Sequence, residues 1–251
     1  MRFIFYYVIC FLLLTGFRIF FTLARKYFRM YKLVIFDLDG TLLNSIGDLA
    51  ESCNYALKMC GYDTHPVNAY NFFVGNGIMK LIERALPEEG RDAKTLREMR
   101  EYFLWHYSKN NNVFTKPYNG IVELLHRLMS DGCMLAVASN KYQEATESII
   151  KSYFGDIDFI KVLGQREGIP IKPNPYVINE ILSCTNVRAE ETIYVGDSGV
   201  DAQTAKNVDG LTFIGVTWGF RPQKELEENG ANILASSCED IWDIYASNKD
   251  L

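Results

Sequence analysis

The chain has 251 residues, of which 48% are hydrophobic, and carries a formal net charge of -5 with a sequence pI of about 5.3. This length is enough for one domain with an insertion or for two small domains. The acidic balance excludes the basic surface typical of nucleic-acid-binding proteins, and the six cysteines match neither a zinc site nor a disulfide framework, so we expect a reducing compartment.

Residues 1–30 form an N-terminal extension that is more apolar than the rest of the chain. Its apolar run at 3–17 is short for a membrane span, which needs about 20 residues. Two interpretations stay open. In one, the extension is a single membrane anchor, and the basic residues after it keep the catalytic domain in the cytoplasm. In the other, which we favour, it is a start-site artefact and a cytoplasmic protein begins at Met30, just before a predicted strand.

Five short apolar runs rich in β-branched residues predict strands that are buried on both faces, as in a parallel sheet. Helical patterns lie between several of these runs, and one of them covers residues 121–129. Alternating strands and helices indicate an α/β fold with a doubly wound, Rossmann-like parallel sheet. We assign residues 31–46 and 114–251 to this core. The predicted strands are residues 32–36, 134–139, 159–164, 192–196 and 211–216.

Residues 47–113 interrupt the alternation of strands and helices. They contain three apolar stripes with helical spacing and no strand pattern. We therefore predict an inserted, all-helical cap domain over 47–113. The stripes are Leu49, Cys53, Leu57 and Cys60; Ile78, Leu81, Ile82, Ala85 and Leu86; and Leu96, Met99, Phe103 and Tyr107.

Polar residues stand where several predicted strands end, and ligands of open α/β sheets bind at the carboxyl ends of the strands. Taken singly, such an aspartate is usually a helix cap or a turn residue, and a lone lysine is usually a surface charge. Because all of them are expected at the same edge of the sheet, a functional site is favoured over separate caps and surface charges. The residues are Asp37, Asp39, Ser139, Asn140, Lys172, Asp197 and Asp201.

Residues 37–40, D-x-D-G, also resemble the start of an EF-hand calcium loop. The spacing excludes an EF-hand, which needs Asp or Asn at position 41, Gly at position 42 and Glu at position 48. This chain has Thr41, Leu42 and Asp48 there. Clustered carboxylates without cysteine or histidine suit Mg²⁺. A divalent ion, a lysine and hydroxyl or N–H donors together suit a phosphoryl group. One aspartate can attack phosphorus, and a second can act as general acid and base.

Four ordered motifs resemble those of the haloacid dehalogenase superfamily: "DLDGT" (37–41), "ASN" (138–140), "KPNP" (172–175) and "GDSGVD" (196–201). Further stretches, such as "FVGNGIMKLIERAL", are similar to its phosphoglycolate phosphatase branch. The resemblance covers roughly residues 31–245. It implies a Mg²⁺-dependent phosphatase of a small phosphorylated metabolite, with phosphoglycolate as the expected substrate, and no nucleic-acid partner. A membrane is a partner only if residues 1–30 are a genuine anchor.

The resemblance also implies a role for each motif residue. Asp37 would be the nucleophile and a metal ligand, and Asp39 the general acid and base, with its backbone carbonyl on the metal. Ser139, Asn140 and Lys172 would bind the phosphoryl group. Asp197 would complete the Mg²⁺ site, and Asp201 would support it without direct contact to the metal.

Alternative functions stay open at this point. They are a phosphatase of a nucleotide, sugar phosphate or pyrophosphate, a phosphomutase of the same superfamily, and a non-catalytic binding protein. Asp39 disfavours dehalogenation, because dehalogenases lack the second aspartate of the first motif. For substrate binding we name Asn76, in a tight Gly-Asn-Gly passage, and Arg84, which could meet a substrate carboxylate or be a plain surface cation.

Overall fold

The computed structural model describes residues 31–247. The predictions on residues 1–30 therefore lie outside the described residues. Within 31–247, none of the helices combines the length and the apolar character that crossing a membrane requires.

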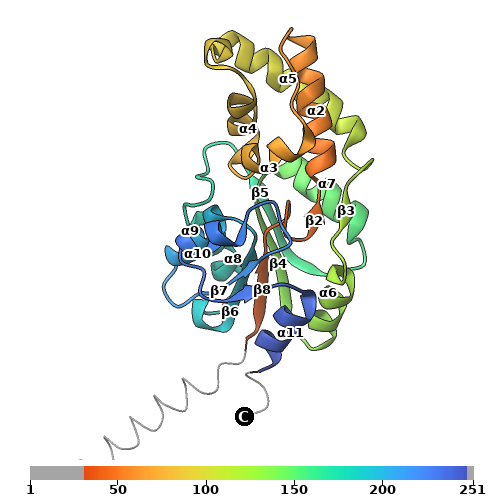
Figure 1. The fold of residues 1–251 in the computed structure, drawn as a ribbon. Coiled ribbons are helices and arrows are strands. Elements are labelled where there is room, and N and C mark those ends of the chain that lie inside the picture. The colour runs from red at the N-terminus through yellow and green to blue at the C-terminus, as the bar shows by residue number, and fades with distance from the viewer. Residues whose placement is uncertain (1–30, 248–251) are drawn as a thin grey trace, which may run out of the picture.

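A six-stranded parallel sheet forms the centre of the core (Figure 1). In its order, β5-β4-β1-β6-β7-β8, the first strand of the chain lies in the middle of the sheet, between the second and fourth predicted strands. The predicted α/β class and the parallel pairing are confirmed. The strands are β1 (Leu33–Phe36), β4 (Met134–Tyr142), β5 (Phe159–Gln165), β6 (Thr192–Gly196), β7 (Thr212–Val216) and β8 (Leu234–Ala235).

Two details of the strands differ from the sequence prediction. Strand β4 continues past Ser139 to Tyr142, although its pairing with β5 is irregular between Ala138 and Tyr142. The prediction ended this strand where the polar residues begin, because an apolar run was its only signal. Three two-residue strands were missed, since so short a segment has no periodicity to detect: β8, and the antiparallel pair β2 (Leu43–Asn44) and β3 (Lys116–Pro117).

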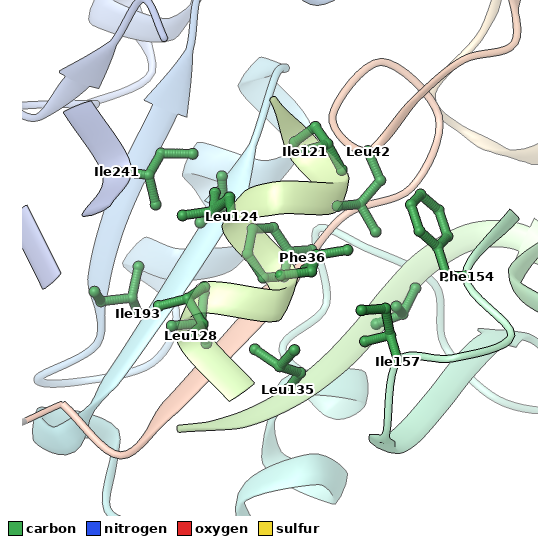
Figure 2. Packing of buried hydrophobic residues seen from close by; sticks show 14 of the residues in the cluster. Phe36, Leu42, Ile121, Leu124, Leu128, Leu135, Phe154, Ile157, Ile193 and Ile241 are labelled. Carbon is green, nitrogen blue, oxygen red and sulfur yellow. The ribbon is translucent and has the colours of Figure 1, made fainter. Parts of the chain in front are cut away.

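Helices cover both faces of the sheet, and alternate residues of β1 point into the two layers. Val34 and Phe36 belong to the hydrophobic cluster on one face of the sheet. Leu33 and Ile35 belong to the cluster on the other face. Figure 2 shows Phe36 packed among Leu124, Leu128 and other residues of the first cluster. The first layer contains α6 (Ile121–Ser130), α7 (Gln143–Tyr153) and α11 (Cys238–Ala246), and the second contains α8 (Tyr176–Thr185) and α9 (Gly199–Lys206). A further helix, α10 (Gln223–Glu228), follows β7.

The inserted segment is helical and stands at one end of the sheet (Figure 1). The three predicted stripes lie on α2, α4 and α5 and pack into a separate hydrophobic cluster, to which the core contributes Ala145 and Phe220. The helical cap predicted as part of the fold is therefore confirmed, while the domain limits at 47 and 113 stay predictions. The helices are α2 (Ile46–Met59), α3 (Tyr70–Phe73), α4 (Gly77–Ala85) and α5 (Ala93–Asn110).

One buried carboxylate joins the two connections between core and cap. Asp48, in the first turn of α2, accepts hydrogen bonds from the backbone N–H groups of Phe114 and Thr115, both at 2.9 Å, and from the Thr115 hydroxyl at 2.6 Å. The side chain is 1% exposed. Hydrogen bonds to a buried, ionised acceptor are stronger than those between neutral groups, so this residue fixes the outgoing chain beside the returning one.

We predict that Asp48→Asn lowers the free energy of unfolding by about 2–4 kcal/mol. The new amide NH₂ group is itself a donor and cannot accept a hydrogen bond from the backbone N–H groups of Phe114 and Thr115, so one of these buried N–H groups loses its acceptor. Urea unfolding followed by circular dichroism measures the change. The matched control is Asp63→Asn, an exposed cap residue, which should stay within about 0.5 kcal/mol of the unmodified chain. A loss no larger than that of the control would contradict the structural role of Asp48.

Candidate active site

Two neighbouring strands end in aspartates at the carboxyl edge of the sheet. Asp37 follows β1, and Asp197 follows β6. The N–H of Asp37 donates to the Val195 carbonyl at 2.9 Å, which continues the pairing of β1 with β6 by one residue. Asp201, in the first turn of α9, completes a buried group in which one carboxylate oxygen from each aspartate lies within 4.8 Å of the others. The predicted strand-end acids are thus brought together.

The ammonium of Lys172 lies between two of these carboxylates. Its Nζ donates to Asp37 Oδ1 and Asp201 Oδ1, both at 2.7 Å, and also contacts the Ala138 carbonyl and the Tyr194 hydroxyl, both at 2.9 Å. The Tyr194 hydroxyl in turn donates to Asp201. Lys172 is 3% exposed, so its charge is balanced by these partners rather than by water.

The side chain of Asn140 fixes the backbone of Lys172. Its Oδ1 accepts from the Lys172 N–H at 2.9 Å, and its Nδ2 donates to the Lys172 carbonyl at 3.1 Å. The same Nδ2 donates at 3.0 Å to the carbonyl of Gly75 in the cap. Asn140 therefore joins the lysine loop, strand β4 and the cap at one point.

Burial and charge perturb the aspartates in different directions. Burial, and then repulsion from Asp201, raises the pKa of Asp37 from 3.8 to about 7 despite Lys172. Burial, followed by repulsion from Asp201 and Asp37, raises the pKa of Asp197 well above its usual value. Burial also acts on Asp201, but the ammonium of Lys172 outweighs it and lowers the pKa of Asp201.

This group of residues fits a divalent cation. The three carboxylates offer only oxygen atoms, the donors that Mg²⁺ prefers, and Lys172 compensates one of their three negative charges. Two glycines leave room beside Asp197, because a side chain at Gly40, where φ is +95°, or at Gly219 would overlap its carboxylate. A cation here would relieve the repulsion that raises the pKa of Asp37 and Asp197.

Asp39 has a lysine of its own. Lys141 Nζ lies 3.0 Å and 3.2 Å from the two carboxylate oxygens of Asp39, and the Ser45 hydroxyl donates to Asp39 Oδ1 at 2.6 Å. The Lys141 side chain is 5% exposed. Burial opposes the charge of this ammonium, but its attraction to Asp39 and to the Tyr107 hydroxyl is stronger overall and raises the pKa of Lys141. Asp37 and Asp39, two residues apart, are therefore paired with different cations.

Two cavities meet at Asp37 and Asp39, which line both of them. The smaller, about 270 Å³, holds the charged group around Lys172. The larger, about 540 Å³, extends toward the cap and is lined by residues 139–142 of β4 and by cap residues. The cap residues are Leu49, Val74, Gly75, Gly77, Ile78, Leu81, Phe103 and Tyr107.

The two cap residues named for substrate binding are placed differently. Arg84 donates to Asn76 Oδ1 at 2.7 Å and to the Phe73 carbonyl at 3.0 Å. Neither Arg84 nor Asn76 is among the residues that line the two cavities, although the adjacent Gly75 and Gly77 are. In the described residues Arg84 thus ties α4 to the end of α3, and a substrate contact for this pair stays a prediction.

Sequence reasoning missed Lys141, Tyr107 and Tyr194. Lys141 had a signal, because it stands two residues after Ser139 and is the only charged residue in its strand. Tyr107 was assigned to the packing stripe of its helix, where its ring does lie, and Tyr194 to a buried strand. Their hydroxyl groups reach the site, which an apolar pattern does not predict.

Known proteins resemble this chain over most of its length. The family model for haloacid dehalogenase-like hydrolase matches residues 34–216. A phosphoglycolate phosphatase of Vibrio parahaemolyticus is 31% identical over 220 residues, which is 86% of this chain and 96% of the relative, and one of Cereibacter sphaeroides is 34% identical over 78% of this chain and 91% of the relative. The crystal structure of a predicted phosphoglycolate phosphatase from Haemophilus somnus matches with a TM-score of 0.78 and 27% identity, covering 86% of this chain and 98% of that one.

We predict that Mg²⁺ stabilises the chain more at about pH 8 than at about pH 5. The folded-state pKa of Asp37 and Asp197 lies above the unfolded value, so the folded chain holds these protons more tightly. The contribution of Asp37 to stability is present at low pH and is lost as the pH rises from about 4 through about 7, and that of Asp197 is likewise lost as the pH rises above about 4. A bound cation would offset that loss where both groups are ionised.

Thermal unfolding with EDTA or millimolar MgCl₂, at both pH values, measures this difference. Asp197→Asn should remove most of the Mg²⁺-dependent shift in Tm, whereas Asp209→Asn, an exposed aspartate of the core, should keep it. An equal Mg²⁺ effect in both variants would argue against a metal site at Asp197.

Proposed function

The chain belongs to the haloacid dehalogenase-like hydrolases, and we propose from this premise that it hydrolyses a small phosphomonoester through an aspartyl-phosphate on Asp37. It is a phosphatase, as its curated relatives are. The proposal concerns the Mg²⁺ dependence, the covalent intermediate, the substrate and the residues that carry each step.

The observation that carries the proposal is the meeting of two unlike cavities at Asp37 and Asp39. One cavity is acidic and holds Lys172, which suits a metal ion and a phosphoryl group. The other is mostly apolar and bounded by the cap, which suits the leaving group. A phosphomonoester that spans both would present its phosphorus to Asp37 and its bridging oxygen to Asp39.

In the first half-reaction, a carboxylate oxygen of Asp37 attacks phosphorus and the bond to the leaving oxygen breaks. Asp39 donates a proton to that oxygen, so the leaving group departs as an alcohol. Lys172, already 2.7 Å from Asp37 Oδ1, stabilises negative charge on the nucleophile and on the transferring group. Ser139, with a buried hydroxyl, and the backbone near Asn140 would donate to phosphoryl oxygens.

In the second half-reaction, water attacks the phosphorus of the aspartyl-phosphate. Asp39 accepts a proton from this water, the acyl phosphate bond breaks, and Asp37 leaves as a carboxylate together with inorganic phosphate. Mg²⁺, held by Asp37, Asp197 and the backbone carbonyl of Asp39, would supply electrostatic stabilisation of the phosphoryl oxygens. Asp201 would keep Lys172 in place rather than contact the ion.

We propose phosphoglycolate as the substrate. The curated relatives described above are phosphoglycolate phosphatases, and the larger cavity lies under the cap beside Asp39, where a leaving group would be protonated. The cap, over residues 47–113, would exclude water and select the leaving group. The first experiment is a panel of phosphorylated metabolites with MgCl₂ or EDTA, in which we expect the highest kcat/KM for phosphoglycolate and no turnover in EDTA.

We predict that Asp37→Asn and Asp39→Asn fail at different stages. Asp37→Asn removes the nucleophile, so no substrate should phosphorylate the chain. Asp39→Asn keeps the nucleophile, and nitrophenyl phosphate, whose leaving group is a stable anion, should give a burst of nitrophenol followed by a stalled phosphoprotein. Phosphoglycolate needs the proton and should react about 10²–10⁴-fold more slowly than with the unmodified chain.

Rapid-quench kinetics with intact-mass detection follows both the burst and the phosphoprotein. Asp209→Asn serves as a control that should turn over normally. Steady turnover of both substrates by Asp39→Asn would refute its role as acid and base, and a phosphoprotein formed by Asp37→Asn would refute the nucleophile.

A further inference from the structure

Besides the half-buried Tyr142 of β4, the lining of the larger cavity contains two buried polar groups that the proposed reaction does not use. Its cap-side wall is otherwise apolar, and Leu49, Val74, Leu81 and Phe103 are buried residues of that wall. The two polar groups are the ammonium of Lys141, from the core, and the hydroxyl of Tyr107, from α5 of the cap. They approach the cavity from opposite domains.

The hydroxyl of Tyr107 is buried and has no hydrogen-bond partner within residues 31–247. The residue is 1% exposed, and its ring is stacked on Phe103 with centroids 5.5 Å apart. Buried polar atoms in native proteins nearly always have a partner, and an exception in the wall of a cavity points to a ligand atom. Packing alone would be satisfied by phenylalanine at this position.

The ammonium of Lys141 retains capacity for a further acceptor. Two of its three protons go to the carboxylate oxygens of Asp39, and the nearby Tyr107 hydroxyl contributes with Asp39 to the raised pKa of Lys141. Nζ lies 4.7 Å from the centroid of the Tyr107 ring, so the cation and the unpartnered hydroxyl belong to one small region. Lys141 is the one cation among the residues that line this cavity.

We propose that Lys141 and Tyr107 form a subsite for an anionic group on the leaving group, a carboxylate in the first instance. This inference rests on the proposed function. The anion would accept one hydrogen bond from the Lys141 ammonium and one from the Tyr107 hydroxyl, while Asp39 keeps its hydrogen bond from Ser45. Because Lys141 also contacts Asp39, the anion lies only a few bonds from the oxygen that Asp39 protonates, which restricts the substrate to short leaving groups.

The apolar wall makes this subsite selective for charge. An anion in a weakly solvated cavity gains more from a fixed ammonium than it does in water, and a neutral group gains little. The two partners belong to different domains, so the subsite is complete only when the cap lies on the core. The subsite therefore selects against small phosphomonoesters with uncharged leaving groups.

The test compares phosphoglycolate with 2-hydroxyethyl phosphate, which replaces the carboxylate by a neutral hydroxymethyl group of similar size. For the unmodified chain we expect kcat/KM for phosphoglycolate to be at least about 10²-fold higher, as for a site that loses a charged partner. Lys141→Met should reduce this ratio by at least about tenfold, Lys141→Arg should restore part of it, and Tyr107→Phe should reduce it about fivefold, mainly through KM.

Lys58→Met, an exposed lysine of α2, is the matched control and should leave the ratio unchanged. If Lys141 only positions Asp39, Lys141→Met will slow both substrates equally, and an unchanged ratio in this variant and in Tyr107→Phe overturns the inference. If Lys141→Met does not fold by circular dichroism, Tyr107→Phe decides alone. An unmodified chain that hydrolyses both substrates equally also overturns it, whereas failure to hydrolyse any phosphomonoester with Mg²⁺ overturns the proposed function instead.

Discussion

The contact of one ammonium with two carboxylates, Lys172 with Asp37 and Asp201, organises the centre of this molecule. Three buried aspartates repel one another strongly in a weakly polar interior, and removal of one partner from a buried pair is costly. The lysine is held at both ends, by Asn140 at its backbone and by Tyr194 and the Ala138 carbonyl at its head. The Lys172 ammonium thus contacts groups from the strand ends and from the start of α9.

The same principle explains how Asp37 and Asp39 coexist two residues apart. Each aspartate has its own buried lysine, Lys172 for the first and Lys141 for the second, and these lysines come from different segments of the chain. Both aspartates line the same two cavities, but they accept from different ammonium groups there. The "DLD" sequence therefore supports two separate electrostatic environments, each centred on its own buried ion pair.

Much of the fold could be predicted from the sequence because each strand that is buried on both faces is a continuous apolar run. The position of Lys172 beside the aspartates could also be expected, since the carboxyl ends of parallel strands share one edge. The apolar pattern of the sequence does not predict where the hydroxyl group of a buried tyrosine points, as with Tyr107 and Tyr194, whose rings pack in hydrophobic clusters. For Arg84, the sequence left a substrate contact and a plain surface cation open; the guanidinium donates hydrogen bonds to the Phe73 carbonyl and to Asn76, and a substrate contact stays a prediction.

The three hydrogen bonds of Asn140 differ in what they join. One reaches the Gly75 carbonyl in the cap, while the other two stay within the core and hold Lys172. A cap that lifts away from the core would break the first and leave the other two intact. The charged interior would then remain assembled while small molecules pass in and out. Such a movement would change the boundary of the cavity for substrate entry and product release without changing the arrangement of the charged groups around Lys172.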